Sequence, residues 1–227
     1  MEMSFAMELR RLAEPIWQKE MEHPFVRGLA TGELPLAAFQ YYLCQDYVYL
    51  IAFSRVFAIA AAKSHDLQTM GEFAQLLHAT LHDEMDLHRK YAAEFGISRE
   101  ELEATVPSPT AYAYTSHLVR TAYEGTLTEV LAAVLPCQWG YHEIGVRLSQ
   151  EPGWEKSPYQ DWIKTYASED FGRLAAMMRN RLDASAAGVH ESAGDLLGRG
   201  AVVDADPRGV RRVGRVADEA RRQPDLL

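Results

Sequence analysis

The chain has only two cysteines, Cys44 and Cys137, among its 227 residues. This number is too small for a disulfide framework, so we expect two free thiols, as in a reducing compartment. The N-terminus lacks the basic-then-apolar layout of a signal peptide. No apolar run approaches the roughly 20 residues that span a bilayer. The sequence therefore predicts a cytoplasmic protein without a membrane partner.

An excess of basic charge is also absent, since the net charge is -9. Such a charge opposes nonspecific binding to nucleic acid or to an anionic membrane, so neither is expected as a partner. No convincing strand alternation appears anywhere in the chain. The 48% hydrophobic and 24% charged residues are typical of a soluble globular protein. We therefore predict an all-α fold of roughly seven to nine helices.

Aromatic residues are missing from the C-terminal part of the chain, because every Phe, Tyr and Trp lies at or before Phe171. Beyond Gly188 the composition shifts to Gly, Ala, Val, Arg and Asp, and residues 198–227 show no regular apolar stripe. Such a segment cannot bury much apolar surface. We expect residues 1–190 to form a single all-helical domain and residues 191–227 to form a poorly ordered tail rich in Arg, Gly and Ala.

Apolar periodicity and capping residues place the helices. The predicted segments are 4–22 with a bend at Pro15, 36–63, 66–95, 110–123, 127–148, 159–166 and 169–187. Ser98 with Glu101 predicts a capping box, and Ser108 predicts an N-cap. Pro136 lies inside the segment 127–148 and predicts a kink there.

The helix 36–63 carries an acidic side chain within an aromatic stripe. Tyr42, Asp46, Tyr49 and Phe53 share one face, at spacings of four, three and four residues. Burial of an unpaired carboxylate is costly, so Asp46 needs a hydrogen-bond donor. Two donors fit equally well. One is a tyrosine hydroxyl or a backbone group, and the other is the amine or amidine edge of a ligand that stacks on the rings.

A second polar cluster contains Glu84 and His88, one helical turn apart, a spacing that can hold a metal ion. The commoner alternative is a solvated polar helix face. A diiron centre would need a second group of His and carboxylate further along the chain, and the only histidine after His142 is His190.

Cys137 and Tyr141 lie one turn apart on the face of a helix. A buried cysteine is most often a small apolar core residue, and the functional alternative is a nucleophile. His142 points away from the Cys137 face, so a Cys–His dyad on this helix is not expected.

Four collinear segments resemble the thiaminase II family, also called aminopyrimidine aminohydrolases. These segments are HPFVRGLATGELPLAAFQYYLCQDYVYL (23–50), EMDLHRKYAAEFGI (84–97), LPCQWGYHEIG (135–145) and WIKTYASEDF (162–171). Together they cover most of residues 1–185. The resemblance implies a haem-oxygenase-like helical bundle, assembled as a homotetramer.

The resemblance also implies an activity and a site. The reaction is hydrolytic replacement of the amine on the methylene of a 4-amino-2-methylpyrimidine, for thiamin salvage, with no metal and no organic cofactor. Cys137 is implied as the nucleophile, and Asp46 as the residue that holds the amino and nitrogen edge of the ring. Tyr49, Tyr114, Tyr141 and Tyr166 are implied to line the pocket and stack on the pyrimidine.

The C-terminal part departs from the family. Members end in a helix with an active-site Glu and an aromatic residue, close to Y-E-x-x-F-W-x-M, and no such segment follows Phe171. Natural divergence, an added extension or a shifted reading frame would each account for this difference. Two other functions remain open: a metal-dependent oxidase or oxygenase that uses Glu84 and His88, and a pyrimidine-binding protein that has lost the chemistry.

Overall fold

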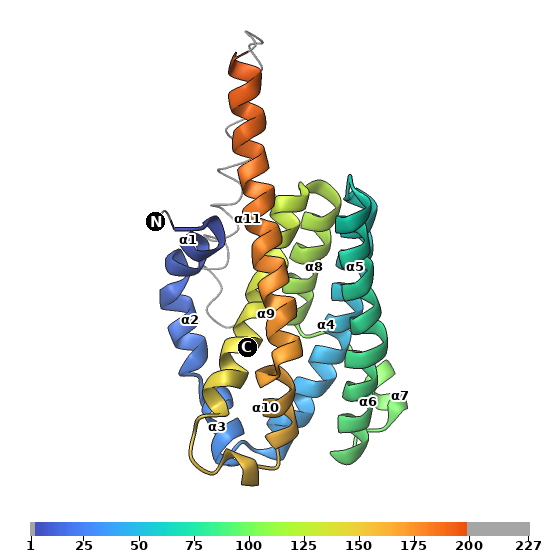
Figure 1. Ribbon diagram of the computed structural model, residues 1–227. Helices are drawn as coiled ribbons and strands as arrows, with labels where there is room; N and C mark the ends of the chain where they lie inside the picture. The colour runs from blue at the N-terminus through green and yellow to red at the C-terminus, as the bar shows by residue number, and fades with distance from the viewer. Residues whose placement is uncertain (1–2, 199–227) are drawn as a thin grey trace. The chain divides into compact units, whose positions relative to one another are not determined.

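The computed structural model describes residues 3–198, with side chains as far as Ala187, and these residues form helices and no strands (Figure 1). Their contacts divide them into two compact units. The first unit contains residues 3–32 and 131–198, and the second contains residues 33–130. The prediction of an all-α chain is confirmed for this part of the protein.

The second unit is built around the long helix α4 (Leu36–Lys63), which contacts α5, α6 and α8. The other helices of the unit are α5 (Leu67–Ala79), the π-helical turn η1 (Thr80–Glu84), α6 (Met85–Glu94), α7 (Arg99–Glu103) and α8 (Pro109–Glu124). The predicted capping box of Ser98 and Glu101 is present with both hydrogen bonds, and Ser108 caps α8. These local signals need no tertiary information, which explains why the sequence alone placed them.

Helix α4 is long and apolar enough to cross a membrane, judged by length and composition alone. However, 61% of its most apolar 18-residue window is buried within the protein. The acidic side chain of Asp46 also lies in its buried face. These features are those of the core helix of a globular unit.

The segment predicted as one helix over 66–95 contains a π-helical turn. Met85 N–H donates to the carbonyl of Thr80, five residues earlier, so the turn holds one residue more than an α-helical turn. In Figure 1, α5 and α6 nevertheless follow one another as a continuous rod. The extra residue rotates all later side chains by about 100° around the axis, and this rotation decides which face of α6 meets α4.

The first unit begins with three short helices, α1 (Phe5–Leu12), α2 (Glu14–Met21) and α3 (Pro24–Thr31). The predicted single helix over 4–22 is therefore wrong in detail. It breaks at Ala13, and Pro15 occupies the first turn of α2, where its missing N–H costs nothing. Helix α3 was not predicted. His23 starts it by accepting a hydrogen bond from Phe25 N–H through Nδ1, at 3.2 Å.

The unit continues through α9 (Leu127–Leu148), η2 (Trp154–Lys156), α10 (Gln160–Ala167) and α11 (Glu169–Gly198). The first four residues of α9 belong to the second unit. Helix α9 has the predicted bounds and continues through Pro136, whose ring is exposed. Helix α11 continues eleven residues beyond the expected end at Ala187, so residues 191–198 of the predicted tail are helical. The remainder of that tail, residues 199–227, lies outside the described residues.

Candidate functional site

The six residues expected to form the site belong to both units. Asp46, Tyr49 and Tyr114 lie in the second unit, and Cys137, Tyr141 and Tyr166 lie in the first. Each group is built by its own set of helices, so the two groups are described separately.

Asp46 is buried in α4, with 8% of its surface exposed, and it has two hydrogen-bond donors from the protein. The Tyr42 hydroxyl donates to Oδ2 at 3.2 Å, and Nε2 of His88 donates to the same oxygen at 2.5 Å. A tyrosine hydroxyl was one of the two alternatives that the sequence left open for this donor, and Tyr42 supplies it. His88 was missed as a partner, although the cost of a buried carboxylate requires a strong donor.

His88 is 2% exposed, so the predicted solvated face is wrong at this position. Its Nδ1 lies 3.0 Å from the carbonyl oxygen of Glu84, within the same helix. Burial alone would lower the pKa of His88, but the carboxylate of Asp46 and, to a smaller extent, Glu84 raise that pKa above its ordinary value. The charged form of the imidazole is therefore favoured by its partners.

Glu84 lies at the end of the π-helical turn, one helical turn before His88. Burial raises the pKa of its carboxyl to about 7, while His88 lowers this pKa and Asp46 raises it. Asp46, Glu84 and His88 thus form a cluster of three side chains whose charges act on one another.

Aromatic rings extend from Asp46 along α4. Tyr49 stacks on Phe53, with ring centroids 5.2 Å apart, and is almost parallel to Tyr114 of α8, at 5.6 Å and an interplanar angle of 3°. Tyr49 is buried and Tyr114 is half-buried. The second unit therefore brings an acidic group and flat aromatic surface together, which suits a planar ligand with a donor edge.

Cys137 of α9 is half-buried and is not part of a disulfide. One turn later, Tyr141 packs against Tyr166 and Trp162 of α10, with ring centroids 4.8 Å and 5.8 Å apart. Tyr166 also meets Phe171 edge-on, at 4.9 Å. The first unit therefore places a thiol one turn from a cluster of four aromatic rings, two of which are predicted site residues.

The backbone of Tyr166 is fixed by α9. His142 donates from Nδ1 to the carbonyl of Tyr166, at 2.9 Å. This ring nitrogen is therefore bonded to α10 and not to the thiol of Cys137. Gly145 lies against the same peptide, and a Cβ built there would be 2.5 Å from the carbonyl carbon of Tyr166. These contacts set the distance and angle between the helices that carry Tyr141 and Tyr166.

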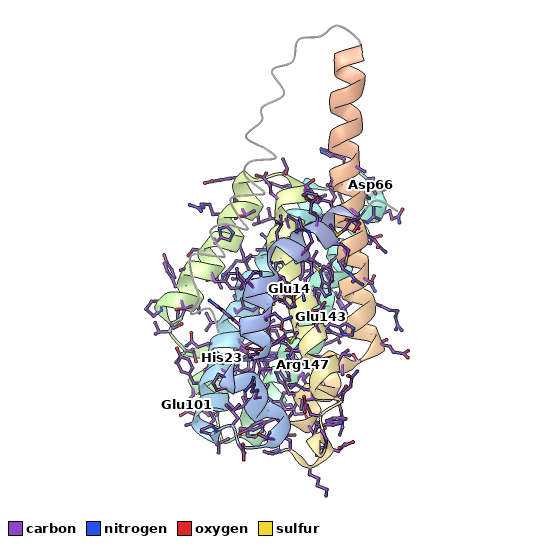
Figure 2. The ribbon with its side chains drawn as sticks, turned by 90° about the vertical axis from the view of Figure 1, so that its left-hand side faces the viewer. Glu14, His23, Asp66, Glu101, Glu143 and Arg147 are labelled. Atoms are coloured by element: carbon purple, nitrogen blue, oxygen red, sulfur yellow. The ribbon has the colours of Figure 1, made fainter. Side chains whose placement is uncertain are left out.

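A charged network lies against another side of α9. Arg10 forms ion pairs with Glu14 and with Glu143 of α9, and Figure 2 shows these two glutamates next to one another. Arg10 also stacks on Trp17, with its guanidinium carbon 4.2 Å from the ring centroid. Glu20 of α2 is turned toward Gly140, and burial raises the pKa of its carboxyl to about 7, with Arg10 lowering and Glu143 raising this pKa.

Replacement of Glu20 by glutamine should stabilise the protein above neutral pH. The native carboxyl keeps its proton up to about pH 7, whereas the unfolded chain loses it near 4.5. The folded state therefore binds more protons between these values, and the free energy of unfolding decreases as the pH rises through this window. Glu20→Gln removes this loss, so the variant should be about 2–3 kcal/mol more stable than the wild type at about pH 8.

Denaturant unfolding at several pH values measures this difference between the two proteins. Glu22→Gln, at an exposed position two residues later, is the matched control for the removal of a carboxylate. A Glu20→Gln variant that parallels the wild type from about pH 5 to 8 would show that this carboxyl ionises as readily in the folded protein as in the unfolded chain.

The alternative of a metal centre at Glu84 and His88 finds no support in this arrangement. Both ring nitrogens of His88 face other protein atoms, namely Asp46 Oδ2 and the carbonyl of Glu84. Over the part of the chain that the structure describes, no group of three or more His, Cys, Asp or Glu side chains could hold a metal ion.

Solved structures identify the class of fold. A domain with a haem-oxygenase-like fold from Shewanella denitrificans aligns over 100% of this chain and 95% of its own, with a TM-score of 0.53 and 15% identity. A TenA family transcription regulator from Silicibacter sp. TM1040 aligns over 98% of this chain and 93% of its own, with a TM-score of 0.79 and 35% identity. The expected haem-oxygenase-like helical fold is confirmed.

Sequence comparison identifies the family. Residues 10–197 match the TENA/THI-4/PQQC family, and the chain belongs to it. An aminopyrimidine aminohydrolase from Halalkalibacterium halodurans is 50% identical over 188 residues, 82% of this chain and 84% of that protein. An aminopyrimidine aminohydrolase from Bacillus subtilis is 43% identical over 182 residues, 80% of this chain and 76% of that protein. The resemblance drawn from the four sequence segments is confirmed.

Proposed function

We propose that this protein is an aminopyrimidine aminohydrolase, which releases the amine of 4-amino-5-aminomethyl-2-methylpyrimidine as ammonia and forms the hydroxymethylpyrimidine used in thiamin salvage. The observation that carries the proposal is the 50% identity, over most of both chains, to an enzyme of that name. The composition of the two groups of side chains supports it. One group presents a buried carboxylate beside flat rings, and the other presents a thiol one turn from an aromatic cluster.

The proposed chemistry uses Cys137 as a nucleophile. Its thiolate adds to a ring carbon of the pyrimidine, which removes the aromaticity and shifts an electron pair onto a ring nitrogen, and this nitrogen takes up the proton that the thiol has lost. The exocyclic carbon–nitrogen bond then breaks and the amine leaves with a proton. Water adds at the exocyclic carbon, and expulsion of the thiolate restores the aromatic ring. The group that supplies protons in the last helix of the family has no matched residue in this chain.

The proposed role of Asp46 is to bind the amino and nitrogen edge of the ring. A charge-assisted hydrogen bond in a buried position is worth more than a neutral one, and it strengthens when departure of the amine leaves positive charge on the amidine edge of the ring. Tyr49, Tyr114, Tyr141 and Tyr166 supply ring surface for stacking. No metal and no organic cofactor takes part in this scheme.

We also propose that the protein works in the cytoplasm as a homotetramer, the assembly implied by the resemblance. Exposed apolar side chains in the second unit support an association surface. Tyr41, Val106 and Tyr112 have 59%, 80% and 64% of their surfaces exposed.

Turnover of defined pyrimidines tests the proposal. We expect the purified full chain to release ammonia from the aminomethylpyrimidine, and a comparison with thiamin will show which leaving group it prefers. Pyrimidine binding without ammonia release would instead indicate a binding protein that has lost the chemistry. Metal content measured on the same preparation separates both outcomes from a metal-dependent oxidase.

A further inference from the structure

The hydrogen bonds around Asp46 are unevenly distributed over its two oxygens. The hydroxyl of Tyr42 and Nε2 of His88 both donate to Oδ2. Within the described residues, this pattern leaves Oδ1 as the oxygen that can accept from a ligand. A carboxylate held through one oxygen has a defined orientation for the other, which is what recognition of a donor edge requires.

The partners of His88 determine where its protons lie. A backbone carbonyl oxygen can only accept, so Nδ1, 3.0 Å from the oxygen of Glu84, carries a proton. An ionised carboxylate can also only accept, so Nε2, 2.5 Å from Oδ2 of Asp46, carries the second proton. His88 and Asp46 thus form a buried pair of imidazolium and carboxylate. The opposite charges of the two side chains compensate one another within the pair.

The π-helical turn is what brings His88 to this position. The buried residues of α5 follow the stripe Thr69, Phe73, Leu76, and the π-helical turn adds Thr80. A regular α-helix would continue that stripe at residues 83 or 84 and at Leu87. With one extra residue in the turn, the buried positions become Met85 and His88 instead. The chain therefore uses an irregular turn to direct an imidazole at Asp46, and such turns are frequent at functional sites.

We propose that His88 is a positioning residue for the reaction: it holds Oδ2 of Asp46 so that Oδ1 faces the amino and nitrogen edge of the pyrimidine. This inference rests on the proposed function for the identity of the ligand, and on the contacts of His88 for the role. His88 does not touch the substrate in this scheme. Its contribution should therefore appear mainly in KM, through the orientation of the carboxylate, and less in kcat.

Two amide substitutions separate the contacts of His88. In His88→Gln, the amide nitrogen reaches approximately the position of Nε2 and can still donate to Asp46. In His88→Asn, the shorter amide reaches approximately the position of Nδ1 and can bond only to the carbonyl of Glu84. We expect His88→Asn and His88→Ala to raise KM by about tenfold or more, the effect of losing a charge-assisted hydrogen bond, and His88→Gln to stay within about threefold of the wild type.

His82→Gln is the matched control, because His82 lies in the π-helical turn before α6 and its side chain is exposed. The KM of the His82→Gln variant should equal that of the wild type. Thermal stability is measured for every variant. Equal increases of KM in His88→Gln and His88→Asn, or increases that follow the loss of stability alone, would overturn the proposal, because a purely structural role does not distinguish the two amides.

A second measurement needs no ligand. Nitrogen-15 NMR of the wild type at neutral pH should show one imidazole with both nitrogens protonated, assigned to His88 by its absence in His88→Gln. Asp46→Asn should return that imidazole to its neutral form. An Nε2 of His88 that carries no proton in the wild type overturns the proposal whatever the kinetics show, because His88 then has no hydrogen to donate to Asp46. A wild type that neither binds nor turns over an aminopyrimidine overturns the proposed function instead, and the NMR result then decides the existence of the pair by itself.

Discussion

Replacement of Cys137 by alanine is expected to lower the kcat for aminomethylpyrimidine hydrolysis by at least about a thousandfold, because no covalent adduct can then form. Pyrimidine binding should change little, since the contacts assigned to binding come from Asp46 and the tyrosines. Cys44→Ala is the matched control. Both cysteines are half-buried and neither is part of a disulfide, so the comparison separates the specific role of one thiol from the general effect of removing sulfur.

Alkylation gives a second measure of the same role. An iodoacetamide-type reagent should modify Cys137 faster than Cys44, and a saturating aminopyrimidine should protect Cys137 only. Full activity in Cys137→Ala, or labelling of both thiols at the same rate with no protection, would rule out the covalent mechanism. The rest of the proposed function would then need another nucleophile, such as water activated directly.

Substitution of Gly145 by alanine should cost about 3 kcal/mol or more of stability and lower Tm by about 6–12 °C. A Cβ at this position would lie 2.5 Å from the carbonyl carbon of Tyr166 and 2.6 Å from the backbone nitrogen of Ala167. Backbone atoms cannot change rotamer to make room, so α10 must shift away from α9. That shift also carries Tyr166 away from Tyr141, so activity should fall together with stability.

Gly71→Ala is the control for Gly145→Ala, and calorimetry measures the stability of both variants. Gly71 lies inside α5 with an exposed surface and no atom within 4 Å of a built Cβ. Alanine there should stabilise the protein by about 0.5–1 kcal/mol through helix propensity alone. Similar, small effects of both substitutions would mean that α9 and α10 tolerate a wider separation than this structure has.

The sequence predicted those helices whose ends carry local signals. The bounds of α4 and α9 agree with the expectation, and Ser98 and Ser108 cap the helices that follow them. The break at Ala13 and the short helix α3 were missed, because Pro15 fits either a bend or a new first turn, and Pro24 fits either the end of one helix or the first turn of the next. Tertiary contacts decide between these two outcomes, and periodicity carries no information about such contacts.

In the candidate site, too, the sequence predicted what depends on local periodicity and missed what depends on tertiary contacts. The stripe of α4 correctly placed Asp46, Tyr49 and Phe53 on a buried face, since that argument needs only the period of a helix. The bond between Asp46 and His88 joins residues 42 positions apart and depends on the π-helical turn. A regular 3.6-residue period does not reveal one additional residue in a turn, so His88 appeared to belong to a solvated face.

The number of residues in the π-helical turn determines whether His88 reaches Asp46. Loss of one residue from the segment Thr80–Glu84 would restore a regular helix and rotate α6 by about 100°, without any change to the residues of α6 themselves. The partner of Asp46 would then move off the contact with α4, although every site residue remained in the sequence. During evolution, an insertion or deletion at this turn therefore has the effect of a substitution at His88. Relatives that differ in length here are expected to differ at that position as well.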